Sequence, residues 1–206
     1  MAISYAPASQ RAALEALLAL DARLGAVVRS TREPLLGQIR LTWWHDALEA
    51  LDLRPPPAEP VLAALSAEVL PRGVTGARLA AMTEGWEALL VDPLDDAAMG
   101  RFAEGRGGRL FGSAAVVLGG AGEPVEQAGE GWALADLHAN LSSADVAEQV
   151  ARAAEERLGR AFDRRWGRAV RPLGALALLA RADLAGVAPG SPRRVARLLR
   201  HRLTGR

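Results

Sequence analysis

The sequence lacks two residue types entirely. Among its 206 residues there is no Cys, and all 25 basic residues are Arg, so there is also no Lys. Without Lys, a P-loop, a Schiff-base enzyme and a kinase-type ATP site are excluded, since each needs an ammonium group on a flexible stem. Without Cys, thiol nucleophiles, thiolate-bound zinc or iron–sulfur centres and disulfides are excluded. Several classes of enzyme and metal protein are therefore ruled out by composition.

Histidine, aromatic residues and long apolar runs are also scarce. The three His residues, His45, His138 and His201, lie far apart in the sequence, so we expect no His-rich metal site. One Tyr, three Phe and no docking motif give no reason to expect nucleic acid as a partner. The longest uncharged run, residues 110–122, has 13 residues, whereas a membrane-spanning helix needs roughly 20. With no signal-peptide pattern at the N-terminus, we expect a cytoplasmic protein, which is also compatible with peripheral membrane attachment.

The composition and the spacing of apolar residues predict an all-α fold. With 50% hydrophobic residues, the chain is long enough for one well-buried domain, so residues 1–206 are interpreted as a single domain. Apolar residues recur at helical spacing, and alternating strand-like runs are absent. The pattern predicts helices over residues 10–29, 34–51, 58–70, 75–90, 94–103, 106–118, 123–141, 143–166, 170–184 and 191–203, with Ser9 and Ser191 as N-caps.

Charge is distributed unevenly along the chain. Residues 1–151 hold 11 Arg and 20 acidic residues, a net charge of −9, whereas residues 152–206 hold 14 Arg and 4 acidic residues, a net charge of +10, and together these give the overall +1. Two interpretations are open. The basic helices neutralise acidic ones inside the fold, or the Arg-rich C-terminus forms an exposed face for an anionic membrane surface or a protein partner. The arginines of that face are Arg193, Arg194, Arg197, Arg200, Arg202 and Arg206.

Two N-terminal segments carry a resemblance to a known family. They read ALLALDARL at residues 16–24 and REPLLGQIRLTWWHDAL at residues 32–48. These segments resemble the N-terminal region of the squalene/phytoene synthase family, which makes isoprenoids by head-to-head condensation. The closest likeness is to its divergent branch, which includes the mitochondrial complex I assembly factor. Later segments resemble further family helices in the same order: RLFGSA at 109–114, GEGWALADL at 129–137 and RPLGALA at 171–177.

The resemblance implies an isoprenoid-synthase-like helical bundle around an apolar cavity, with two Asp-rich motifs on facing helices. In that family the carboxylates, four residues apart on one helix face, hold Mg²⁺ ions that bind the substrate diphosphate. In this sequence the first motif falls on Gly25 and Arg29, and the second falls near Asp136, Asn140 and Ala144. We therefore expect no metal at these positions and no cofactor, with Mg²⁺ required only if the chain is an active enzyme.

Two functions remain open at this stage. The favoured one is a divergent family member that has lost prenyltransferase catalysis and acts as an apolar-ligand-binding or assembly protein, in respiratory complex assembly if the branch resemblance holds. The alternative is an active head-to-head prenyltransferase acting on isoprenoid diphosphates with an altered Mg²⁺ site. That alternative requires Asp21, Asp46 or Asp136 to replace the missing ligands, so these are the weak catalytic candidates. On balance we do not expect an enzyme.

The candidate ligand-binding residues are Arg40, Trp43, Trp44, Trp132 and Asn140, and the expected ligand is an isoprenoid or another apolar molecule. Adjacent helical residues are about 100° apart, so one of Trp43 and Trp44 is in the core and the other is exposed or lines a cavity. We assign Trp43 to the core. For Arg40, both a phosphate contact and a salt bridge to a neighbouring acid are open.

A glycine-rich segment, Gly105-Arg106-Gly107-Gly108-Arg109, interrupts the helical pattern. It is not a dinucleotide-binding fingerprint, because Leu110 stands where that motif needs Gly and no strand precedes it. We interpret it as a turn between helices, in which Arg106 and Arg109 are available to an anion.

Overall fold

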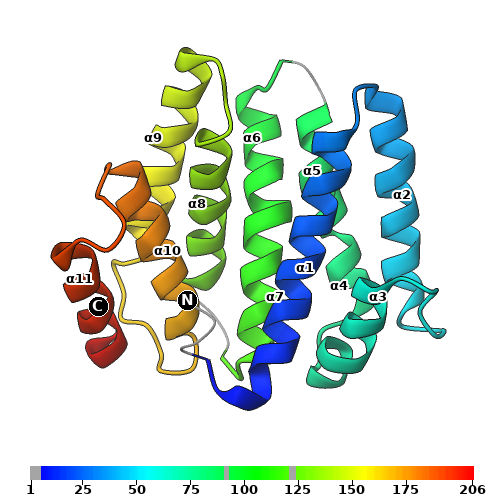
Figure 1. The fold of residues 1–206 in the computed structure, drawn as a ribbon, viewed down its shortest axis with the longest axis horizontal. Helices are drawn as coiled ribbons and strands as arrows, with labels where there is room; N and C mark the ends of the chain where they lie inside the picture. Colours follow the sequence, from blue (N-terminus) through cyan, green and yellow to red (C-terminus); the bar gives the residue numbers. More distant parts are fainter. Residues whose placement is uncertain (1–5, 91–92, 121–123) are drawn as a thin grey trace.

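The computed structural model describes residues 6–90, 93–120 and 124–206, and Figure 1 shows their arrangement. In these ranges there are helices and no β-strand, which confirms the all-α fold class. The α-helices are α1 (Ala8–Ser30), α2 (Pro34–Ala50), α3 (Pro60–Ala64), α4 (Gly76–Ala80), α5 (Met82–Glu87), α6 (Asp96–Phe102), α7 (Arg109–Val117), α8 (Val125–His138), α9 (Ala144–Arg160), α10 (Arg171–Leu184) and α11 (Pro192–Thr204). Short π or 3₁₀ segments adjoin them: η2 (Leu65–Val69), η3 (Leu70–Arg72), η4 (Ala88–Leu90) and η5 (Ala103–Gly108).

Helix α1 runs through the middle of the molecule, while α2 and α11 lie at opposite ends of its long axis (Figure 1). The buried hydrophobic residues of α1, α2, α7, α8 and α9 belong to one contiguous cluster, together with Leu173, Ala177 and Ala180 of α10. No helix among the described residues is long and apolar enough to cross a bilayer. In the first motif region Gly25 is buried and Arg29 is exposed, and α7 packs against both α1 and α8, the helix of the second motif region.

Helix boundaries agree with the sequence prediction in most places, and two N-caps illustrate the agreement and its limits. Ser191 caps α11 as predicted, because its side chain accepts a hydrogen bond from the Arg194 backbone N–H. Ser9 is not a cap, since α1 begins at Ala8, directly after Pro7. The predicted helix start at Glu123 lies outside the described residues.

The predicted helix over residues 143–166 is too long. Helix α9 ends at Arg160, and Trp166 lies in the connection to α10. The Trp166 ring is buried, donates a hydrogen bond from Nε1 to the Ala161 carbonyl at 2.9 Å, and stacks on Phe162 with ring centroids 5.6 Å apart. The chain packs these two rings together instead of continuing the helix, and His201 of α11 packs against both of them.

Candidate functional site

The glycine-rich segment is helical, so its interpretation as a turn was wrong. Residues 103–108 form the π-helical segment η5, which joins α6 to α7 without a break. A single π turn inserted in a helix changes the direction of the side chains that follow it, and such turns are frequent at functional sites. Here the segment turns Arg106 into the interior, where the residue is only 5% exposed.

Close backbone contacts explain why glycines occupy this segment. A Cβ atom at Gly105 would lie 2.6 Å from the Gly85 Cα, and one at Gly107 would lie 2.0 Å from the Gly129 carbonyl oxygen. Both distances are far shorter than any Cβ contact that a protein tolerates. Glycine therefore allows η5 to pack directly against α5 on one side and α8 on the other, and it fixes Arg106 between them.

Arg106 joins α1 and α8, the two helices on which the sequence resemblance predicts the family's motifs. Its Nε donates to Asp21 Oδ1 at 2.8 Å and its Nη2 donates to Asp21 Oδ2 at 3.0 Å, which makes a bidentate pair with α1. Its Nη1 donates to Asp136 Oδ2 on α8 at 2.6 Å. Asp21 lies 85 residues before Arg106 in the sequence and Asp136 lies 30 residues after it, and one guanidinium group binds both.

Three aromatic rings surround the same guanidinium. Its central carbon lies 4.5 Å from the centre of the Trp86 ring, 4.8 Å from that of Trp132 and 5.5 Å from that of Phe102. A cation over an aromatic face at these distances gains roughly 0.5–2 kcal/mol per ring, more when water is excluded. The rings also exclude water from the Asp21 side, which strengthens the charge-assisted hydrogen bonds there.

Burial differs across the cluster. The side chains of Arg106 and Asp21 are 6% and 8% exposed, whereas that of Asp136 is 47% exposed. Burial by itself lowers the pKa of Arg106, but the hydrogen bonds and charges of the two aspartates outweigh that effect and raise its pKa above the ordinary value. Arg106 is therefore permanently charged, and the buried part of the cluster is a neutral Arg–Asp pair.

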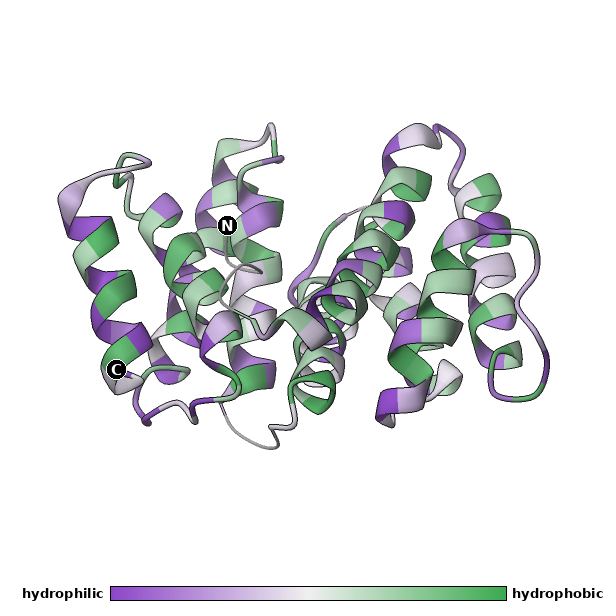
Figure 2. Cartoon of the chain, turned by 60° about the horizontal axis from the view of Figure 1, so that its bottom comes forward, coloured by the Kyte–Doolittle hydropathy of each residue, from purple (hydrophilic) through white to green (hydrophobic). Residues whose placement is uncertain are grey.

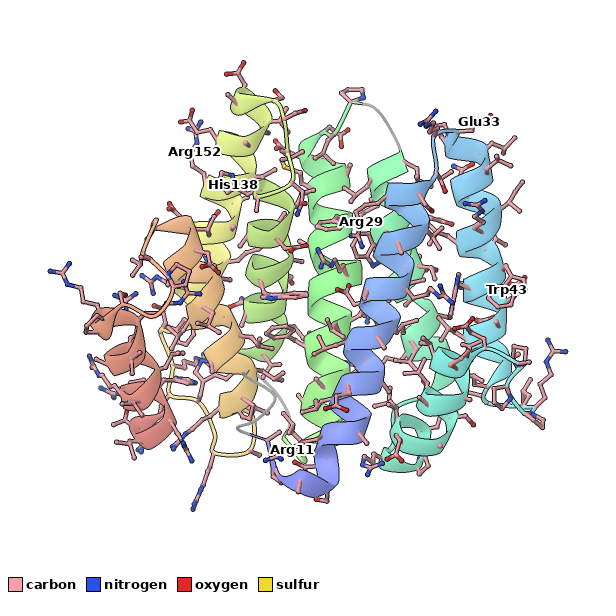
Figure 3. All side chains as sticks on the ribbon, viewed as in Figure 1. Arg11, Arg29, Glu33, Trp43, His138 and Arg152 are labelled. Carbon is pink, nitrogen blue, oxygen red and sulfur yellow. The ribbon has the colours of Figure 1, made fainter. Side chains whose placement is uncertain are left out.

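The first motif position does not fit Mg²⁺. Gly25 supplies no oxygen, and a Cβ atom there would lie 2.8 Å from the Trp86 ring and 2.9 Å from an Arg29 guanidinium nitrogen. Arg29 itself lies in the last turn of α1 (Figure 3) and brings a positive charge. The one carboxylate of this region, Asp21, already accepts from Arg106 with both oxygens. Hard cations need several free oxygen ligands, which this set does not offer.

The second motif position is equally poor in carboxylates. Asn140 donates from Nδ2 to the Asp136 backbone carbonyl at 2.7 Å, so its amide closes the end of α8. Ala144 is the exposed first residue of α9 and carries no ligand atom. Within the described ranges, no three His, Asp or Glu side chains lie close enough together to hold a metal ion.

The remaining candidates lie on α2, apart from the Arg106 cluster. Trp44 is buried, whereas Trp43 is half exposed and projects outward (Figure 3). The assignment of Trp43 to the core was therefore wrong, and Trp44 is the tryptophan that packs in the core. They meet edge to face with centroids 5.2 Å apart. Arg40 donates to Thr31 Oγ1 at 3.2 Å rather than to an acid. Asp46 is exposed beside His45, at 3.6 Å.

Interior space is small where an apolar ligand was expected. A pocket between α1, α7 and α10 is almost entirely apolar but has a volume of about 20 Å³, room for roughly one water molecule. Its lining residues are Leu14, Leu17, Leu18, Leu110, Phe111, Ala114, Pro172, Leu173 and Leu176. A wider hollow of about 240 Å³ lies at the surface, lined by Arg23, Val27, Arg40, Trp43, Trp44 and Glu59. It contains three of the candidate ligand-binding residues.

Sequence reasoning singled out Asp21, Asp136 and Trp132 but did not bring them together, because it placed Arg106 in a turn. A signal was available. Gly85 and Gly129 lie inside helical patterns, where each glycine costs about 1 kcal/mol relative to Ala, so a close approach of backbones is the expected reason for them. These glycines indicate close contacts between helices, but the sequence does not show that Gly85 meets Gly105 or that Gly129 meets Gly107.

A comparison with protein families gives one match. The model of the squalene/phytoene synthase family matches residues 1–162, which is most of the chain and includes both motif regions. No curated protein and no solved structure gives a significant match.

Proposed function

Because the chain belongs to the squalene/phytoene synthase family, we propose that it is a member in which the Arg106 cluster replaces the catalytic metal site, and that it acts as an assembly or scaffold protein without prenyltransferase activity. Fold and function separate readily in families of this kind, since activity depends on a few side chains. The observation that carries the proposal is the seating of Arg106 between Asp21 and Asp136.

The argument is one of charge and geometry. Metal-assisted departure of a diphosphate needs carboxylate oxygens that converge on a divalent cation. Here the guanidinium already supplies the positive charge that such a cation would bring, and it uses both oxygens of Asp21 and one of Asp136. A second cation in the same space would face a permanent positive charge at hydrogen-bonding distance. The cluster is therefore suited to holding α1, η5 and α8 together and not to binding the metal ions that assist departure of a diphosphate.

An exposed apolar row on α2 supports a role in binding other molecules. Leu35, Leu36, Ile39 and Trp43 are among the most exposed large apolar residues of the chain, and their spacing puts them on neighbouring positions of one helix face. Contiguous exposed apolar surface of this kind marks interaction sites in soluble proteins. The hollow beside Trp43 is the place where an apolar ligand would bind, with Arg23 and Arg40 at its edge.

The decisive experiment uses the purified chain with Mg²⁺ and farnesyl or geranylgeranyl diphosphate. We expect no release of inorganic diphosphate, no condensed hydrocarbon product, and no Mg²⁺-dependent rise in melting temperature with a non-hydrolysable diphosphate analogue. An authentic squalene or phytoene synthase serves as the positive control. Product formation that depends on Mg²⁺ would overturn the proposal and favour the altered-site prenyltransferase.

The assembly role is tested in the organism that carries the gene. Deletion is expected to lower the amount of assembled respiratory complex I in its membranes, measured by native gel electrophoresis and NADH oxidation. Re-expression of the wild-type chain should restore both, and so should Asp136→Asn, because the carboxylate is half exposed and has no catalytic task in this proposal. The double variant Ile39→Ser/Trp43→Ser, which removes the exposed row, should not. Unchanged complex I in the deletion strain would reject this role.

A further inference from the structure

Helix α11 is attached to the rest of the molecule by one narrow face. His201 is fully buried, with its ring centroid 5.7 Å from those of Phe162 and Trp166. The Gly205 carbonyl accepts a hydrogen bond from the Trp166 backbone N–H at 2.9 Å, and Arg194 pairs with Asp183 at 2.6 Å. These contacts fix which side of α11 faces inward.

The opposite side of α11 is apolar and exposed. Val195, Leu199 and Leu203 follow one another at intervals of four residues and are 47%, 48% and 76% exposed. At about 100° per residue, Leu199 and Leu203 each lie roughly 160–200° around the helix from His201. The apolar row therefore points away from the bundle. Helix α11 itself lies at one end of the molecule (Figures 1 and 2).

Arginines flank this row on both sides. By the same angular count, Arg193 and Arg200 lie along one side of the row and Arg202 along the other, whereas Arg197 lies only about 40° around the helix from His201, near the inward face. Residues 191–206 contain six Arg and no acidic residue. In the described part of the chain, no carboxylate lies within ion-pair distance of Arg193, Arg197 or Arg200. Internal neutralisation, the first interpretation of the charge asymmetry, accounts for Arg157, which pairs with Glu130 at 2.9 Å, but not for these three.

We propose that this face of α11 docks in the plane of an anionic lipid membrane, with Val195, Leu199 and Leu203 inserted between headgroups and the flanking arginines at the lipid phosphates. An apolar stripe bordered by basic side chains is the pattern that binds a bilayer interface without spanning it. Long arginine side chains can extend sideways to the headgroup level while their stems cover apolar surface.

Charge decides between the membrane and a second copy of the chain. A symmetric dimer through this face would bring the arginine rows of two α11 helices together, which like-charge repulsion disfavours. An anionic membrane supplies the complementary charge across its whole surface and attracts each nearby basic residue. This proposal is independent of the metal site and stands whether or not the chain is an enzyme.

The test is flotation of the full-length protein with vesicles of phosphatidylcholine, with or without phosphatidylglycerol. We expect the protein to float with the anionic vesicles, to remain unbound with phosphatidylcholine alone, and to be released by high salt. The variant Arg193→Gln/Arg200→Gln should weaken partitioning roughly 25-fold, since each arginine near the surface contributes about a fivefold factor. Leu199→Ser/Leu203→Ser should weaken it at least about tenfold.

Matched controls separate this face from general charge and apolarity. Arg54→Gln/Arg101→Gln removes the same charge elsewhere on the surface, and Leu53→Ser/Val116→Ser removes exposed apolar residues away from α11 and from the α2 row. Both should bind like the wild type, and circular dichroism checks that every variant is folded. The proposal is overturned if the wild type does not float, if the controls lose binding as strongly as the α11 variants, or if light scattering shows a dimer that Leu199→Ser/Leu203→Ser dissociates.

Discussion

The arginine at the centre of the molecule and the arginines at its edge have the same side chain but opposite surroundings. Arg106 is buried, with two carboxylates and three aromatic rings around its guanidinium. Arg193, Arg197 and Arg200 of α11 are exposed and have no carboxylate partner among the described residues. The first is a structural group whose charge is neutralised inside the fold, and the others are charges that remain available to a partner.

This difference shows why the net charge of +1 says little about the molecule. An arginine neutralised in the interior contributes to stability and not to the external field, while unpaired surface arginines contribute to the field and little to stability. Substituting the buried arginine should therefore change the free energy of unfolding far more than substituting the exposed ones.

The largest effect is expected at the centre. Arg106→Met leaves Asp21 buried without a partner, which costs about 3–5 kcal/mol of unfolding free energy. The double variant Arg106→Met/Asp21→Leu removes both charges and should recover most of that loss. Urea denaturation followed by circular dichroism measures both. If the double variant is as unstable as the single one, the ion pair is not the source of the effect.

The backbone contacts that position Arg106 come next. Gly107→Ala places a methyl group against the Gly129 carbonyl and should lower the unfolding free energy by about 1–3 kcal/mol. Gly159→Ala is the matched control, because this glycine lies in α9 with no atom near a built Cβ, and the change should stabilise by about 0.5–1 kcal/mol. Equal effects of the two substitutions would contradict the close packing of η5 on α8.

A pH effect is expected where α11 meets the bundle. Burial lowers the pKa of His201, and the charge of Arg171 acts in the same direction, so the unfolded chain binds this proton at a higher pH than the folded one. Stability should therefore fall as the pH drops below the unfolded value of about 6.5, by at most about 1.4 kcal/mol per pH unit, until the folded His201 is itself protonated.

Thermal melting between about pH 7 and pH 5.5 tests this window. His201→Gln should flatten the dependence even though it lowers stability at neutral pH. A wild-type slope that survives His201→Gln would place the titrating group elsewhere.

The smallest effect is expected at the edge. The triple variant Arg193→Gln/Arg197→Gln/Arg200→Gln should change the unfolding free energy by no more than about 0.5 kcal/mol, because exposed charges without partners contribute little to stability. Urea denaturation at low and at high salt is the measurement. A loss comparable to that of Arg106→Met would show that these arginines are structural, and the contrast between centre and edge would fail.

The sequence was sufficient for the fold class and for most helices, because the apolar period of α1, α2 and α10 is plain and prolines or glycines mark their ends. It failed at residues 105–108, where helix propensity predicts a break and tertiary packing overrides it. The glycine contacts with Gly85 and Gly129 are formed between helices, so they leave no mark on local periodicity.

The candidate site was predictable in part for the same reason. The family resemblance predicts two motif regions, and Gly25, Arg29 and Ala144, which stand there, have no carboxylate. It could not show that a residue outside both motifs, Arg106, lies between them, since side-chain direction after a π turn depends on the three-dimensional path of the backbone. The prediction that Trp43 rather than Trp44 is buried failed for a similar reason, because either residue can face the core with the same helical spacing of apolar residues.

The contact between Gly25 and Trp86 also has an evolutionary consequence. A substitution that introduces Asp at position 25 first meets the Trp86 ring, and one that removes Arg106 first leaves Asp21 unpaired in the interior. Each single step towards an Asp-rich site is therefore unfavourable until the others have been made. A carboxylate-rich metal site is therefore more than one substitution away from this sequence, because the Gly25–Trp86 contact and the Arg106–Asp21 pair would have to change together.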